Sequence, residues 1–106
     1  LPDYDIALYT HKKMKTTSES SLEALNLLLP VLEEITDWTA EAIHDAVFAK
    51  IEALGVKNGY LLWPLRVALS GKQFTPGGGI EIAAVIGRED TLSRVKTGIE
   101  KLKSAL

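Results

Sequence analysis

The chain has 106 residues, the size of one domain, and its 46% hydrophobic and 25% charged residues are ordinary for a globular protein. It contains no cysteine, which excludes disulfide bonds and cysteine-ligated metal sites. The formal net charge of −2 lacks the strongly basic balance typical of proteins that bind nucleic acid non-specifically.

The first 17 residues show no long periodicity. We expect a short helical turn around Tyr4 to Tyr9, followed by the basic run HKKMK. We interpret residues 1–17 as a lead-in from a preceding domain that is absent from this chain, and residues 1–106 as a single domain.

A first long helix is predicted from Ser18 onward. Ser18 or Ser20 can cap it, and Ser20 with Glu23 fits a capping box. Pro30 should kink this helix rather than end it, because the apolar pattern continues in register beyond the proline. The apolar residues recur every three to four positions, at Leu22, Leu25, Leu28 or Leu29, Leu32 and Ile35.

Two further helices are expected in the middle of the chain. One begins after Thr39 as N-cap and ends at Gly55, with an apolar stripe at Ile43, Val47, Ile51 and Leu54. The next segment, 57–70, is too continuously apolar to show one exposed face, so a buried strand is an alternative for its last residues. We favour a helix stopped by Gly71, because Pro64 would break a central strand but is tolerated in a first helical turn.

The last part of the chain predicts two more helices. Residues 80–86 could form a strand, but their composition favours a helix that ends at Gly87. Residues 88–106 carry the clearest helical pattern, which Gly98 weakens modestly, with apolar positions at Leu92, Val95, Ile99, Leu102 and Leu106. The whole pattern predicts an all-α bundle of about five helices with short loops.

Patterns for catalysis or metal binding are weak. His44 has Phe48 four residues later, so no two-ligand metal motif forms, and we interpret it as a partly exposed helix histidine. The run 70–72, Ser-Gly-Lys, does not complete a phosphate-binding loop, because Arg66 stands where that loop needs glycine and Gln73 follows the lysine. We therefore expect a domain that is not catalytic alone and that holds no metal or cofactor.

The stretch TPGGG at residues 75–79 concentrates backbone freedom in one place. Thr75 can cap the following helix, and Pro76 can occupy its first position or the turn. Glycines allow the backbone to approach a partner closely, and Arg66 and Lys72 add positive charge nearby. Composition alone, however, favours a tight turn between two helices.

The residues from Trp63 to Val95, WPLRVALSGKQFTPGGGIEIAAVIGREDTLSRV, closely resemble the end of bacterial-type glutamyl-tRNA synthetases. That family ends with Pro-Leu-Arg, an apolar pair, Leu-Thr/Ser-Gly, Thr/Ser-Pro-Gly, an apolar helix, Gly-Lys/Arg-Glu and a final basic-apolar helix. Each step occurs here in order and at the expected spacing. The segments DWTAEAIHDAV and LGVKNGYLLWPLR also look like this family, so the resemblance covers essentially the whole chain.

The resemblance implies the C-terminal anticodon-binding domain of a glutamate–tRNA ligase, an all-α bundle. In the family, the arginine of Pro-Leu-Arg and the Thr-Pro-Gly turn lie against anticodon bases. Carried over to this chain, these are Arg66, Thr75, Pro76 and Gly77, and we add two expected RNA-binding residues from their own chemistry, Lys72 for its charge and Gly78 for its bare backbone. The family usually places a large apolar residue after Thr-Pro-Gly, whereas this chain has Gly78 and Gly79.

The expected partners are the anticodon loop of glutamate tRNA and the catalytic domain of the parent chain, where ATP and Mg²⁺ would be used. We expect a cytoplasmic monomer without membrane association. Two other interpretations stay open: a helical protein-interaction domain that docks a partner in an apolar groove, and a structural cap of a larger chain.

Overall fold

The computed structural model describes residues 6–10, 16–71 and 78–106. Its helices are a short 3₁₀ helix and five α-helices: η1 (Ile6–Tyr9), α1 (Ser18–Glu33), α2 (Ala40–Leu54), α3 (Asn58–Ser70), α4 (Gly79–Ile86) and α5 (Arg88–Ala105). The prediction of an all-α bundle of about five helices is confirmed. Within the described ranges, no helix has the length and hydropathy to cross a bilayer.

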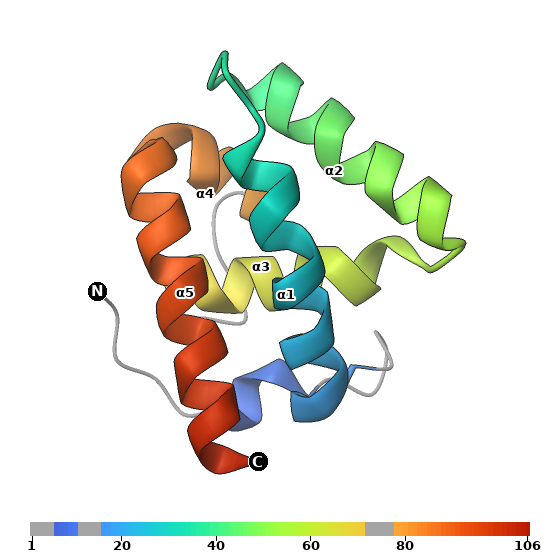
Figure 1. The fold of residues 1–106 in the computed structure, drawn as a ribbon, viewed down its shortest axis with the longest axis vertical. Coiled ribbons are helices and arrows are strands. Elements are labelled where there is room, and N and C mark those ends of the chain that lie inside the picture. The colour runs from blue at the N-terminus through green and yellow to red at the C-terminus, as the bar shows by residue number, and fades with distance from the viewer. Residues whose placement is uncertain (1–5, 11–15, 72–77) are drawn as a thin grey trace.

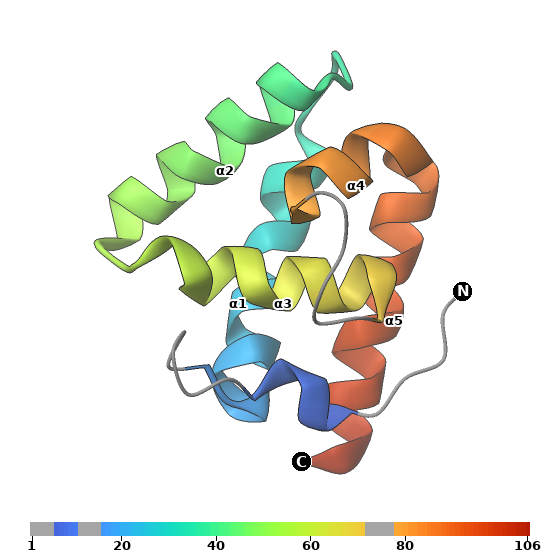
Figure 2. The same ribbon diagram turned by 180° about the vertical axis from the view of Figure 1, so that it is seen from behind.

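Helix α3 lies at the centre of the bundle. It contacts α1, α2, α4, α5 and η1. Figure 1 shows α1 and α5 side by side, with α3 crossing behind them, and Figure 2 shows α4 lying over α3 on the opposite face. Because neighbours cover α3 on several sides, seven of its 13 residues are buried, which explains why its sequence shows no exposed stripe.

Pro64 does not lie in the first turn of α3, contrary to the expectation. The helix begins at Asn58, so the proline is inside it and its ring is buried. A proline in a helix interior removes one backbone hydrogen bond and costs about 3 kcal/mol. The helix continues because the apolar residues on both sides of the proline, Leu61, Trp63, Leu65 and Val67, are all buried in the core.

The N-cap of α1 is Thr17, not Ser18 or Ser20 as expected. The Ser20 amide donates to Thr17 Oγ1 (3.0 Å), and the Thr17 amide donates to Ser20 Oγ (2.9 Å). The capping box therefore joins Thr17 and Ser20 rather than Ser20 and Glu23, because the helix begins earlier than a Ser20 cap allows. Beyond Pro30 the helix continues to Glu33, so the proline does not end it, as predicted.

The expected start and end of α2 and the expected end of α3 agree with the structure. Thr39 Oγ1 accepts a hydrogen bond from the Ala42 amide (3.1 Å) and caps α2. Gly55 and Gly71 follow α2 and α3 with φ of 68° and 67°, a left-handed conformation that glycine adopts without strain.

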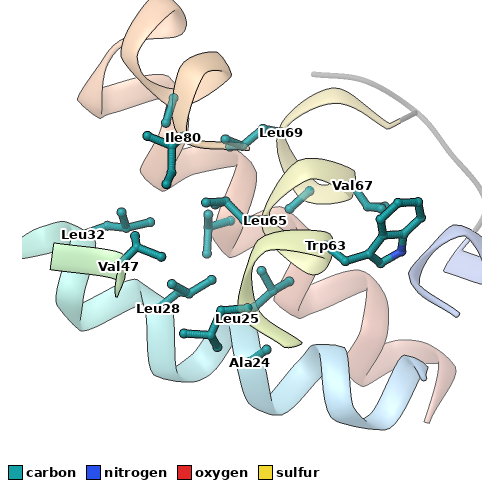
Figure 3. Close-up of a cluster of buried hydrophobic side chains, with 14 of the residues drawn as sticks. Ala24, Leu25, Leu28, Leu32, Val47, Trp63, Leu65, Val67, Leu69 and Ile80 are labelled. Atoms are coloured by element: carbon teal, nitrogen blue, oxygen red, sulfur yellow. The ribbon is translucent and has the colours of Figure 1, made fainter. Parts of the chain in front are cut away.

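The hydrophobic core joins all five α-helices. Figure 3 shows its central part, where leucines of α1 and α3 meet Val47 of α2 and Ile80 of α4. Trp63 lies at the edge of this cluster, and its Nε1 donates to the Leu8 carbonyl oxygen of η1 (2.9 Å). That hydrogen bond ties the beginning of the described chain to the central helix.

Gly98 is required by packing and is more than a weak point of α5. A Cβ built there would lie 2.7 Å from the Tyr9 hydroxyl and 3.1 Å from Leu25 Cδ1. Tyr9 is fully buried, and its carbonyl oxygen accepts a hydrogen bond from Thr16 Oγ1 (2.7 Å). The glycine therefore lets α5 approach α1 and η1 more closely than any side chain would allow.

Candidate functional site

A groove with a volume of about 490 Å³ lies between α2, α3 and the start of α4. This volume is within the range of about 300–1,000 Å³ found for small-ligand pockets. Three elements contribute residues to its walls. These include His44 and Phe48 of α2, Leu62, Trp63 and Arg66 of α3, and Gly78, Gly79 and Glu81 at the beginning of α4.

Arg66 is held on the α3 wall of this groove. Its guanidinium carbon lies 5.9 Å from the centre of the Trp63 ring, a distance at which a cation and an aromatic face attract each other. Trp63 is itself fixed, because it is buried and its indole nitrogen donates to Leu8. The planar guanidinium, with its five donors, is therefore carried on a rigid part of the fold.

The start of α4 forms a second wall. Its N-cap is Gly78, and none of the described side chains caps it, so the backbone N–H groups of the first turn have no acceptor within the helix. These donors carry the positive end of the helix dipole. Trp38 Nε1 and Thr91 Oγ1 both donate to the Ala83 carbonyl oxygen (2.9 and 3.4 Å), which fixes the other end of this short helix.

The beginning of α4 also corrects an expectation. The N-cap is Gly78 and the first helical residue is Gly79, so Thr75 is not the N-cap, and of the two places expected for Pro76 the first helical position is excluded. The apolar pattern of residues 80–86 predicted the helix correctly. The helix cap was predicted too early in the chain, because threonine and proline are typical residues at helix starts. The two residues themselves lie outside the described residues.

Gly78 and Gly79 have different roles. A Cβ on Gly79 would lie 3.0 Å from Leu65 Cγ and 3.1 Å from the Arg66 backbone nitrogen, so Gly79 allows α4 to pack directly on α3. A Cβ on Gly78 would lie 3.0 Å from Glu81 Oε2, the end of a flexible exposed side chain. Packing therefore demands a glycine at 79, whereas at 78 it does not.

Among the described side chains, one positive and one negative charge lie close to Gly78. Arg66 Nη2 lies 3.8 Å, and Glu81 Oε2 3.0 Å, from the position that a Cβ on Gly78 would occupy, so one cation and one anion share this corner of the groove. A phosphate would meet the carboxylate as well as the guanidinium. The corner therefore suits a neutral polar group, such as the edge of a nucleobase, better than a phosphate.

The α2 wall of the groove is formed by residues outside the expected binding set. His44 and Phe48 stack with ring centroids 4.3 Å apart and an angle of 21° between the ring planes. The His44 side chain is 57% exposed, and its Nδ1 lies 3.4 Å from Asp45 Oδ1. The interpretation of His44 as a partly exposed helix residue is correct, but the spacing of four between His44 and Phe48 was a signal that both rings share one helix face.

Of the six expected RNA-binding residues, the structure places two, Arg66 and Gly78, and brings them together in the groove. Lys72, Thr75, Pro76 and Gly77 lie outside the described residues. Across the described ranges there is no group of three or more His, Cys, Asp or Glu side chains that could hold a metal ion.

Comparison with known proteins gives a consistent result. The sequence model described as "Anticodon binding domain" matches residues 1–99. The glutamate–tRNA ligase of Clostridium tetani is 58% identical over 106 residues, which cover 100% of this chain and 22% of that protein. The ligase of Clostridium acetobutylicum is 58% identical over 103 residues, covering 97% of this chain and 21% of that protein.

A solved structure shares the fold. The crystal structure of a glutamate tRNA ligase from Elizabethkingia meningosepticum, in complex with its amino acid, matches with a TM-score of 0.76 and 27% identity, over 96% of this chain and 19% of that one. The chain thus spans about a fifth of the length of the curated relatives that it matches. With nearly its whole length matched by the family's sequence model, the chain belongs to the anticodon-binding domain family.

Proposed function

We propose that this chain recognises the anticodon loop of a tRNA, and that it does so in the groove between α2, α3 and α4. The observation that carries the proposal is the meeting, in one concave site, of Arg66 and the start of α4, whose first-turn N–H groups are capped by none of the described side chains. These are a planar cationic side chain and a row of backbone donors, supplied by two helices that pack directly on each other.

Anticodon bases suit this chemistry because they are unpaired. A base turned out of the loop exposes its edge to hydrogen bonds and its faces to stacking. Arg66 can donate to an edge or stack on a face, and the N–H groups at the beginning of α4 can donate to carbonyl oxygens or ring nitrogens of a base. Lys72, Thr75, Pro76 and Gly77 would extend the same surface.

The similarity to glutamate–tRNA ligases supports a more specific version of the proposal. The chain would be the anticodon-binding domain of such an enzyme, with residues 1–17 leading in from the part before it. ATP-dependent charging of the tRNA with glutamate, and the Mg²⁺ that accompanies ATP, would belong to the catalytic domain. We further propose that the protein is monomeric and cytoplasmic, where translation takes place.

The test is an NMR titration of the ¹⁵N-labelled 106-residue chain with an anticodon stem-loop of glutamate tRNA. Shifts should concentrate at the Arg66 side chain and at the amides of Gly78 and Gly79. Arg66→Met should weaken binding about tenfold or more, because a hydrogen bond to a charged group is worth about 1.5–3 kcal/mol.

Arg88→Met is the matched control. Arg88 is exposed and donates to the Glu33 carbonyl oxygen (2.9 Å) at the end of α1, and it does not line the groove. Its loss should leave RNA affinity within about twofold of the wild type. Absence of shifts at millimolar RNA would overturn the proposal and favour a protein-docking role for the groove.

A further inference from the structure

The α2 wall of the groove carries an aromatic surface that the proposed function has not yet used. His44 and Phe48 lie one helical turn apart with their rings stacked at 4.3 Å. Phe48 is half-buried against the core, whereas most of the His44 side chain is exposed. The Phe48 ring is therefore held by the core, whereas the His44 ring is accessible to a ligand. Both rings line the groove.

The opposite side of the groove supplies hydrogen-bond donors and, among the described side chains, one cation beside one anion. Arg66 and the start of α4 provide donors, and Glu81 offsets the arginine. One wall is thus aromatic and the other polar. A nucleobase needs this combination, since stacking satisfies its faces and polar groups satisfy its edges, whereas a phosphate would find one arginine beside a carboxylate.

We propose that the His44–Phe48 pair stacks against a second unpaired base of the RNA, next to the base that Arg66 and the start of α4 contact. The inference rests on the proposed anticodon recognition and deepens it: the groove would hold two successive loop bases instead of one. The occupant of the aromatic wall is a base, because the wall continues directly into the surface that contains Arg66 and Gly78.

The experiment uses anticodon stem-loops of glutamate tRNA in which 2-aminopurine replaces one loop base at a time. Stacking of 2-aminopurine on an aromatic ring quenches its fluorescence. With the wild-type chain, quenching should occur at the loop position whose base stacks on His44 and Phe48, next to the position contacted by Arg66. His44→Ala and Phe48→Leu should abolish this quenching and weaken binding about 5- to 100-fold, the usual effect of losing one stacked base.

Three further variants make the result specific. Phe48→Tyr keeps the ring and should retain both the quenching and the affinity. Leu54→Ala removes an exposed apolar side chain (37% exposed) from the same helix outside the groove, and should change neither. Because Phe48 also packs on the core, its variants are compared at matched folded fractions, and His44→Ala at the exposed ring gives an independent answer.

The outcomes separate the two proposals. If the RNA binds and Arg66→Met weakens it, but the His44 and Phe48 variants leave quenching and affinity unchanged, the stacking role is wrong and anticodon recognition stands. If the stem-loop does not bind the wild-type chain at all, both are wrong. Quenching that depends on Arg66 but not on His44 or Phe48 would likewise reduce the site to a single base.

Discussion

Arginine and glycine serve different purposes in two regions of this bundle, the packed region around α5 and the groove between α2, α3 and α4. Gly98 permits close packing where α1, α5 and η1 meet, and two arginines of α5 donate to carbonyl oxygens at the ends of α1 and α3. On the groove side, an arginine, a glycine and a histidine line a cavity of about 490 Å³. An arginine or glycine in the sequence is thus structural or ligand-facing according to what the fold places beside it.

The arginines of α5 make the contrast concrete. Arg94 Nη1 donates to the Leu69 carbonyl oxygen at the end of α3 (2.6 Å), and Arg88 Nη2 donates to the Glu33 carbonyl oxygen at the end of α1 (2.9 Å). The last carbonyls of a helix have no N–H donor within that helix, so both arginines satisfy such groups and place positive charge at the negative end of a helix dipole. Arg66, in contrast, lies over an aromatic ring at the wall of the groove.

The largest effect should come from breaking the packed side at Gly98. Gly98→Ala places a methyl group 2.7 Å from the hydroxyl of Tyr9, whose side chain is fully buried. Overpacking should lower the free energy of unfolding by about 2–3 kcal/mol, although alanine is by itself the better helix former. Urea unfolding measures the change, with the exposed Lys96→Ala as control. A Gly98→Ala chain as stable as the wild type would contradict the role given to this glycine.

The next effect separates the two α5 arginines. Arg94→Met removes the charged donor from the Leu69 carbonyl oxygen in a half-buried setting, and should cost about 1.5–2 kcal/mol of unfolding free energy. Arg88→Met removes an exposed hydrogen bond and should cost about 0.5 kcal/mol or less. Thermal unfolding followed by circular dichroism compares the two. Equal losses would mean that burial does not set the strength of these caps.

Most of the fold could be predicted because three of the helices bury apolar residues on one face only. The stripes of α1, α2 and α5 repeat every three to four residues, and Thr39, Gly55 and Gly71 mark helix ends by their own chemistry. Helix α3 gave an ambiguous pattern since other helices surround it, and Pro64 misled because buried neighbours outweigh its cost. The cap of α1 was misplaced because Thr17 and Ser18 are both good caps by type.

The site was predictable in part for a different reason. Arg66 was identified by resemblance to a family and Gly78 by its bare backbone next to that motif, and the structure places both in one groove. The need for Gly79 could not be read from sequence, because it depends on the distance between α4 and Leu65 of α3. His44 was assessed as a metal ligand, so its partnership with Phe48 was overlooked.

The two adjacent glycines, Gly78 and Gly79, should differ in how much an added side chain lowers stability. Gly79→Ser forces the α3–α4 contact apart by a few tenths of an ångström and should cost about 1 kcal/mol of unfolding free energy. Gly78→Ser meets only the flexible Glu81 side chain, and serine is a good N-cap, so stability should change by about 0.5 kcal/mol or less. Chemical unfolding of both variants tests this. If the Gly78 variant is the less stable one, the assignment of the two glycines is reversed.

The smallest effect concerns Tyr60, near the start of α3. Burial, with the negative charge of Glu23 and a hydrogen bond to it, raises the pKa of the Tyr60 phenol above its usual value of 10.0. The folded state therefore favours the neutral phenol. Its contribution to stability is fully present below pH 10 and is lost as the pH rises from there through the higher folded-state pKa.

Tyr60→Phe isolates this contribution from the other groups that ionise in alkali. Urea unfolding of the two chains between pH 8 and about pH 11 should give a constant difference in unfolding free energy up to about pH 10. Above that, the wild type should lose stability relative to the variant, by about 0.5 kcal/mol or less because the pair is near the surface. A difference that stays constant across the whole range would mean that α1 and α3 are joined here by packing alone, as they are around Leu25 and Leu65 in the core.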